Sequence, residues 1–342
     1  MSFPEVRVFA LTAFVAAAGA LAAYLLSFPA PFLVGPALAV TIGGLSGLAL
    51  NVPYAVRNAC FVVVGLSMGT GLTPEVFVAA RTWPLSFLMV PVALVVLLHS
   101  ATWILQRFFG YDRVTALLAA SPGHLSFVLS LAADTKSDLM AVGVIQSVRV
   151  LALTLTVPLI VDLLGLDAVV PVSTPHMDAI PLAASFAAAL LFGYFLLRWR
   201  VPAALLIGGM IASGSTHLTG VVTGDIPPWI MIPTYVLLGG MIGSRFSGAS
   251  LRAMRTAFVA GGVVTVVVVV MAAVIAAFVS YMTAVPLDAA LIAFAPGGLE
   301  TMAAMAVMLN AQPTYVGAHH VLRLLILSGL MPFALRKDMN EK

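Results

Sequence analysis

Twelve apolar segments follow one another along this chain, separated by short polar stretches. Most of them reach the length of about 20 residues that a helix needs to cross a lipid bilayer. Hydrophobic residues make up 62% of the sequence and charged residues 8%, which leaves too little polar surface to cover a soluble protein of 342 residues. Because a helix satisfies its own backbone groups inside lipid, the sequence predicts an all-α integral membrane protein.

The segments form two similar series of six. In the first half of the chain they run over residues 8–26, 32–50, 54–72, 83–105, 114–133 and 139–164. In the second half they run over residues 179–197, 203–222, 229–244, 256–283, 288–309 and 314–335. We therefore expect two membrane repeats, over residues 1–171 and 179–342, joined by a linker at 172–178.

The repeat is also visible in individual residues. Ten of the 38 positions from Ser121 to Pro158 are identical to the residue 174 positions later. Apolar bias alone explains matched Leu or Val but not matched Pro, Gly and Arg, as at Pro122, Gly123 and Arg149. Duplication of a structural unit explains them directly.

Each series contains one segment interrupted by a Pro-Gly motif, in "SPGHLSFVLSL" at residues 121–131 and "APGGLETMAAM" at residues 295–305. Proline removes a backbone donor and glycine permits a turn, so both motifs predict a broken helix. Free backbone at membrane depth is tolerated only inside protein or beside a wet cavity. The exposed N–H groups at the start of a half-helix favour an anionic ligand there.

The distribution of basic residues predicts how the segments cross. If all twelve cross, seven Lys and Arg lie on each side, which is no bias. If the two broken segments enter and return on one side, Arg81 alone lies outside and thirteen basic residues lie inside, as the positive-inside rule expects. The inner set is Arg7, Arg57, Arg107, Arg113, Lys136, Arg198, Arg200, Arg245, Arg252, Arg255, Arg336, Lys337 and Lys342. Five crossings per unit make two inverted-topology repeats with one re-entrant segment each.

Arg149 and Arg323 fall deep within the last segment of each repeat. A buried charge in a membrane needs a partner or a wet cavity. The two arginines are therefore either structural, paired with an acid or with carbonyls at a helix end, or part of a site for a substrate or ion. Glu300, just after the second break, is the expected partner of one of them, or a group that couples transport to protons or cations.

The other candidate site residues surround the breaks. Gly123, His124 and Ser126 belong to the first motif, and Gly297 and Gly298 to the second. His124 either lines the cavity or caps the returning helix. His319 and His320 precede Arg323 by one turn, and since adjacent residues face different sides of a helix, we expect only one, His320, to point at the site.

Several classes of protein are excluded by missing patterns. The six histidines are scattered, without the His, Asp or Glu cluster of a metal centre, and no phosphate loop or nucleophile motif occurs. We therefore expect neither an enzyme nor a cofactor. The sequence lacks a DNA-binding motif, so no direct nucleic-acid contact is expected, and the partners are lipid, a small solute or ion, and a second copy of the chain as a homodimer.

The two motifs and the pattern His320-x-x-Arg323 resemble those of the bacterial AbrB membrane family over essentially the whole chain. This family differs from the soluble DNA-binding regulator that shares its name. Its members are described as regulators of aidB expression, as ammonia monooxygenases or as transporters. The resemblance implies a multi-pass protein of the bacterial inner membrane, with both termini in the cytoplasm as the charge distribution also predicts.

The function expected from the sequence is ion-coupled secondary transport of a small solute, with an organic anion favoured, at the paired Pro-Gly motifs. The alternative is a membrane-embedded sensor that affects gene expression through a partner. Monooxygenase activity is disfavoured because the residues offer no copper or iron site.

Overall fold

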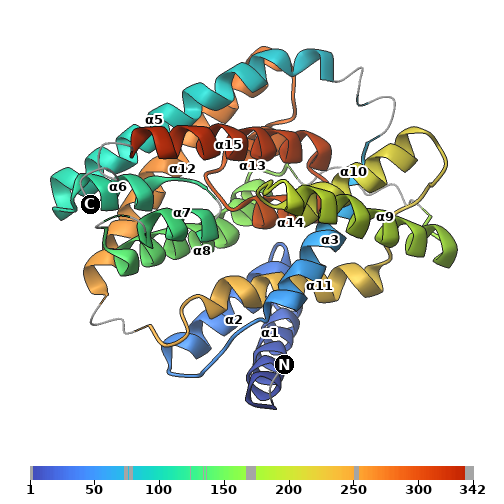
Figure 1. Ribbon diagram of the computed structural model, residues 1–342, viewed down its shortest axis with the longest axis horizontal. Helices are drawn as coiled ribbons and strands as arrows, with labels where there is room; N and C mark the ends of the chain where they lie inside the picture. The colour runs from blue at the N-terminus through green and yellow to red at the C-terminus, as the bar shows by residue number, and fades with distance from the viewer. Residues whose placement is uncertain are drawn as a thin grey trace.

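The computed structural model of the chain describes residues 3–72, 76, 80–123, 125–133, 135, 137–166, 175–249 and 254–335. The regular elements in this part of the chain are helices, and an isolated bridge joins His176 and Asp225 (Figure 1). The first half holds α1 (Phe3–Leu25), α2 (Pro31–Leu45), α3 (Tyr54–Thr70), the turn η1 (Ala80–Thr82), α5 (Pro84–Phe109), α6 (Arg113–Ala120), α7 (Leu125–Ala133) and α8 (Leu139–Leu163). The second half holds α9 (Ala179–Arg198), α10 (Ala204–Leu218), α11 (Pro228–Ser244), α12 (Arg255–Thr283), α13 (Leu287–Phe294), α14 (Leu299–Met308) and α15 (Pro313–Ala334).

The helix bounds recur along the chain. Both ends of α2 and α10 lie 173 residues apart, and both ends of α3 and α11 lie 174 residues apart. The short helices α6 and α13 repeat with the same spacing of 174 at both ends. The order of long and short helices is thus the same in the two halves.

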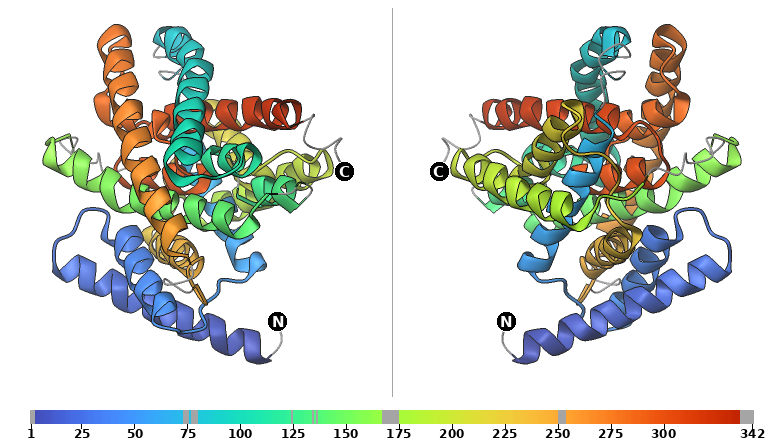
Figure 2. Two further views of the ribbon diagram at one scale, coloured as in Figure 1. Left: turned by 90° about the vertical axis from the view of Figure 1, so that its left-hand side faces the viewer. Right: turned by 90° about the vertical axis from the view of Figure 1, so that its right-hand side faces the viewer.

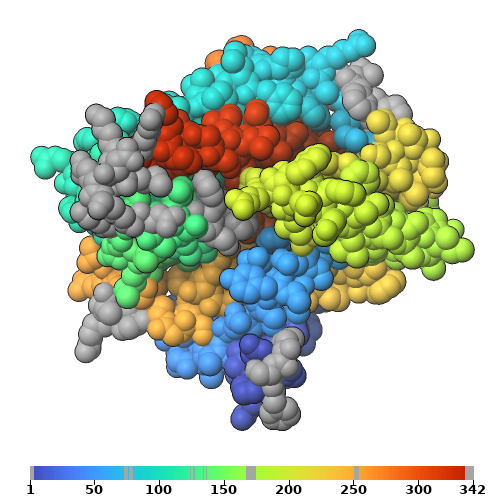
Figure 3. All heavy atoms as spheres, viewed as in Figure 1, coloured from blue at the N-terminus to red at the C-terminus, as the bar shows by residue number. Residues whose placement is uncertain are grey.

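Within the described part of the chain, six helices are long and apolar enough to cross a membrane, namely α1, α5, α8, α9, α12 and α15. Their outer faces expose large apolar side chains, including Phe14 on α1, Ile180 on α9 and Val266 on α12. Figure 3 shows α9 lying along one surface of the molecule. Such exposure suits lipid rather than water, so length and surface together are consistent with a membrane protein.

Glycine pairs let the remaining helices approach one another closely. A Cβ atom added at Gly65 of α3 would lie 2.1 Å from the carbonyl oxygen of Leu206 in α10. A Cβ at Gly239 of α11 would lie 2.4 Å from the carbonyl oxygen of Leu33 in α2. Gly65 and Gly69 on α3 form one Gly-x-x-x-Gly spacing, and Gly239 and Gly243 on α11 form another. Both spacings serve helix packing, as expected in membrane proteins.

The two Pro-Gly motifs break their helices as predicted. The segment expected over residues 114–133 is divided into α6 and α7, and the segment expected over 288–309 into α13 and α14. Figure 1 places α13 and α14 in the interior beside α15, whereas α1 lies at the edge of the molecule. In Figure 2, α5 and α12 stand side by side at the end opposite α1, and they contact each other. The breaks thus lie among long helices.

Candidate functional site

Arg149 closes the end of the first broken helix. Its Nη1 donates to the carbonyl oxygen of Ala120 at 2.9 Å and its Nη2 to that of Ser121 at 3.0 Å. The last carbonyls of a helix lack partners within the helix and form the negative end of its dipole. A guanidinium with two parallel donors suits both needs, and the side chain is buried.

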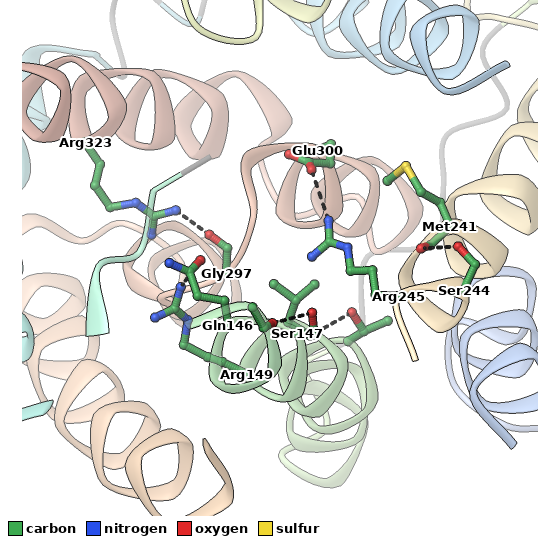
Figure 4. Close-up of polar contacts among 12 residues, drawn as sticks. Gln146, Ser147, Arg149, Met241, Ser244, Arg245, Gly297, Glu300 and Arg323 are labelled. Carbon is green, nitrogen blue, oxygen red and sulfur yellow. Dashed lines mark hydrogen bonds and ion pairs between the residues drawn. The ribbon is translucent and has the colours of Figure 1, made fainter. Parts of the chain in front are cut away.

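Arg323 closes the second break in the same way as Arg149 closes the first (Figure 4). Its Nη1 donates to the carbonyl oxygen of Ala295 at 2.7 Å and its Nη2 to that of Gly297. Gly298 then begins α14 as its N-cap residue in an extended conformation. Each arginine thus holds a break in place from the long helix that follows it.

One turn earlier, a second pair of side chains reinforces the same contacts. Nε2 of Gln146 donates to the carbonyl oxygen of Leu118 at 2.9 Å, and Nε2 of His320 donates to that of Ile292 at 3.0 Å. His320 is fully buried, and its Nδ1 has no hydrogen-bond partner among the described residues. The structure therefore directs Nε2 of His320 at α13.

Glu300 forms an ion pair with Arg245, whose Nη2 lies 3.7 Å from Oε1 (Figure 4). The expected ion pair of Glu300 with Arg149 or Arg323 is wrong, because those guanidinium groups instead bind the carbonyls at the breaks. Arg245 directly follows α11, and the sequence predicts it only as one of the basic residues on the inner side of the membrane. Its pairing links α11 to the second broken segment.

The Glu300–Arg245 pair borders a cavity of about 270 Å³, here called the Glu300 cavity. It is lined by Asn51, Val52, Tyr54, Arg57, Leu125, Leu129, Met241, Ser244, Arg245 and Glu300. The guanidinium of Arg57 lies 4.5 Å from the ring centre of Tyr54, and its Nε is buried without a hydrogen-bond partner among the described residues. Two guanidinium groups against one carboxylate make this cavity suited to an anion.

The two breaks meet at a smaller cavity of about 20 Å³, here called the proline cavity. It is lined by Val90, Ala93, Leu94, Leu97, Pro122, Ala293, Phe294, Pro296, His319 and Arg323. This volume suits about one water molecule rather than an organic solute. Residues 174 positions apart in the chain, Pro122 and Pro296, thus share one enclosed space.

The other residues chosen from the sequence fall around these breaks. A Cβ at Gly123 would lie 3.2 Å from Cγ2 of Val128, and a Cβ at Gly297 would lie 2.8 Å from the side chain of Met302, so both glycines are tightly packed. Ser126 belongs to α7, but its side chain, like all of His124, lies outside the described residues.

Sequence reasoning missed a cluster of three buried side chains. Oγ of Ser86 on α5 lies 2.5 Å from the hydroxyl oxygen of Tyr315 and 2.7 Å from Nε2 of His319. His319 also stacks on Phe87 with ring centres 4.5 Å apart. No signal at Ser86 marks it in the sequence, because a single serine in an apolar segment is common.

The described residues contain no group of three His, Cys, Asp or Glu that could hold a metal ion. The charged groups that line the Glu300 cavity and the proline cavity are three guanidinium groups, of Arg57, Arg245 and Arg323, and the carboxylate of Glu300. Such a set is suited to binding and orienting a charged solute.

Comparison with known proteins agrees with the sequence motifs. A protein from Bacillus subtilis (strain 168) described as "Uncharacterized protein YhjN" is 26% identical over 292 residues, which cover 79% of this chain and 75% of the relative. A protein from Escherichia coli (strain K12) described as "Putative regulator AbrB" is 26% identical over 310 residues, 86% of each chain. No solved structure matches the chain.

The family model described as "Transition state regulatory protein AbrB" matches residues 32–337 and so includes both breaks and all the site residues above. The resemblance predicted from the sequence is therefore confirmed: the chain belongs to the AbrB family.

Proposed function

We propose that the protein is an ion-coupled secondary transporter of a small organic anion, with its site where the two broken segments meet. The observation that supports this most directly is the proline cavity, in which Pro122, Pro296 and Arg323 come together. Two helix breaks come together at this point, and Nε of Arg323, which has no hydrogen-bond partner among the described residues, is available to a ligand there.

The charge of the interior supports an anion as the solute. Arg149, Arg323 and Arg245 are buried or nearly so, and Glu300 pairs with Arg245. The hydrogen bonds of Arg149 and Arg323 to carbonyls disperse their charge but do not neutralise it. A bound carboxylate would offset this excess of positive charge in a medium of low dielectric constant.

The recurrence of helix bounds supports a duplicated architecture of inverted-topology repeats. With α6–α7 and α13–α14 as re-entrant segments, each repeat crosses the membrane five times, so the second repeat is upside down relative to the first. This arrangement places the two breaks from opposite sides at the middle of the membrane, where many secondary transporters bind their substrates.

Two larger cavities lie at the two ends of α3, and in this proposal a solute enters from them. The Glu300 cavity includes Tyr54 at the start of α3. The second cavity, of about 330 Å³, here called the Tyr315 cavity, includes Gly71 directly after α3. Its lining is Gly71, Val76, Trp83, Asn310, Gln312, Pro313, Thr314 and Tyr315. A helix of this length separates them by about 25 Å, close to the thickness of the hydrocarbon layer.

The arrangement of basic residues indicates which side of the membrane each cavity faces. Arg57 and Arg245 belong to the set expected in the cytoplasm, so the Glu300 cavity faces inward in this proposal. The Tyr315 cavity lies next to the loop with Arg81 and faces outward. The proline cavity between them is too small for a solute, as expected for a transporter between its two open states.

The experiment that tests this function is ligand-dependent thermal unfolding of the full-length protein in lipid nanodiscs, with acetate, lactate, succinate and citrate as probes. A ligand that binds the folded state raises the unfolding temperature in proportion to its occupancy. We expect one or more acids to stabilise the parent, and a smaller effect on Arg57→Gln, which removes an anion-binding group from the Glu300 cavity. Arg107→Gln, an exposed position at the end of α5, is the matched control.

Uptake of the stabilising acid into vesicles then separates a transporter from a membrane sensor. Accumulation against a concentration gradient supports transport. Binding without uptake favours the sensor, a function consistent with the description of the E. coli relative as a regulator. If none of the four acids stabilises the parent, the proposal of organic-anion transport fails.

A further inference from the structure

Three buried side chains connect the Tyr315 cavity to the proline cavity. Tyr315 lines the first, His319 lines the second, and Ser86 hydrogen-bonds to both. The distances are 2.5 Å from Tyr315 to Ser86 and 2.7 Å from Ser86 to Nε2 of His319. An unbroken line of hydroxyl and imidazole groups thus joins two cavities that protein otherwise separates.

When the imidazole ring of His319 is neutral, all the hydrogen bonds of this line run in one direction. Nδ1 of His319 lies 2.8 Å from the carbonyl oxygen of Tyr315, which can only accept, so Nδ1 bears the ring proton. Nε2 then accepts from the hydroxyl of Ser86, and Ser86 accepts from the hydroxyl of Tyr315. Each donor points toward His319, as a path that delivers a proton to Nε2 requires.

Aromatic rings pack against the line. Phe87 stacks on His319 at 4.5 Å between ring centres, Phe294 lies at 5.7 Å, and Trp83 meets the ring of Tyr315 at 5.3 Å. Ser86, Tyr315 and His319 are each at most 1% exposed. Their hydrogen-bonding groups therefore have one another as partners in an apolar sheath.

The line is present in one half of the chain only. The residues 174 positions from Ser86, Tyr315 and His319 are Ala260, Ala141 and Ile145, all apolar. The closing bonds of Gln146 and His320, by contrast, recur in both halves. A feature needed only for helix packing would not require three polar groups at positions where the other half packs without them.

We propose that Tyr315, Ser86 and His319 form a proton path that loads a proton from the Tyr315 cavity onto His319. A hydronium ion in the cavity gives a proton to the Tyr315 hydroxyl, which passes its own proton to Ser86, and Ser86 passes its proton to Nε2 of His319. The ring becomes an imidazolium, water remains in the cavity, and both hydroxyl groups are restored.

The surroundings of His319 couple this proton to an anion. Among the described groups that face it, Ser86 and Phe87 come from α5, Phe294 from α13, and Tyr315 and Arg323 from α15, with His320 adjacent in the chain. The proline cavity contains one cation, Arg323, and no carboxylate among its lining residues. An anion bound there would favour a charged His319, so anion and proton would be carried together.

This inference rests on the proposed function for its purpose, but its test does not need a substrate. Full-length protein in nanodiscs is subjected to a rapid drop in pH, and histidine protonation is followed by time-resolved infrared spectroscopy. His319→Gln identifies the signal of His319. We expect Ser86→Ala and Tyr315→Phe to slow its appearance by roughly 10²-fold, the usual contribution of a positioned proton-transfer group.

Thr265→Val is the matched control, because it removes a buried hydroxyl that donates within its own helix, to the carbonyl oxygen of Gly261 at 2.6 Å. It should protonate His319 at the rate of the parent. Equal rates in the parent and in both path variants would overturn the proposal, and so would a parent in which His319 takes up no proton at any pH that leaves the protein folded. The proton path and organic-anion binding are thus tested separately.

Discussion

Arg149 and Arg323 stand 174 positions apart, and each uses both terminal guanidinium nitrogens to bind carbonyl oxygens at the end of a broken helix. Lysine has the same charge but no fixed pair of donors. We expect Arg323→Lys to lower the free energy of unfolding by about 1–3 kcal/mol, the cost of leaving a buried carbonyl without a partner. Thermal unfolding in nanodiscs measures this change.

Arg107→Lys is the control for this substitution, since Arg107 is exposed in the last turn of α5. It should unfold at the temperature of the parent. If Arg323→Lys did so as well, the guanidinium would not be what holds the second break, and its bonds to Ala295 and Gly297 would be unimportant for stability.

The ion pair between Glu300 and Arg245 predicts a coupling between two positions that are far apart in the chain. Their side chains are 8% and 16% exposed, so water screens the pair only in part. In a double-mutant cycle with Glu300→Gln and Arg245→Gln, we expect the two losses of stability to be non-additive by about 1 kcal/mol. Additive losses would show that the 3.7 Å contact contributes nothing.

The breaks and the two inward arginines could be predicted from the sequence, because Pro, Gly and a charge inside an apolar segment each have a direct physical consequence. The pairing of Glu300 with Arg245 could not be predicted from the sequence. Arg245 lies 55 positions earlier, just beyond the end of α11, and only the packing of α11 against the rest of the chain brings it to α14.

The choice between His319 and His320 shows the same limit. The sequence predicts that only one of the two adjacent rings, His320, points at the site. In the structure, Nε2 of His320 is bound to the carbonyl of Ile292, while His319 lines the proline cavity. Helix periodicity gives the angle between neighbouring side chains, whereas the rotation of α15 depends on its contacts with α5 and α13.

The closest helix contacts predict where added volume is not tolerated. A methyl group at Gly65 would meet the backbone of Leu206, with its carbonyl oxygen at 2.1 Å. We expect Gly65→Ala to separate α3 from α10 and to lower the unfolding temperature. At Gly262 in α12 no atom lies within 4 Å of the added Cβ, so Gly262→Ala should leave stability unchanged or raise it. Equal effects of both variants on thermal unfolding would contradict this packing.

The last prediction concerns the path of the second broken segment. Because the chain is duplicated, the first broken segment is expected to run in the same way, and the number of crossings in the first repeat decides whether the repeats are inverted. Ala284, before α13, and Asn310, after α14, are both exposed. If α13 and α14 enter and return on one side, Ala284→Cys and Asn310→Cys should both react with a membrane-impermeant thiol reagent added outside intact cells. The protein's single cysteine, Cys60, is buried and is replaced by alanine in this background. If only one of the two positions reacts from outside and the other reacts only after the membrane is opened, the segment crosses, each repeat has six crossings, and the repeats lie parallel rather than inverted.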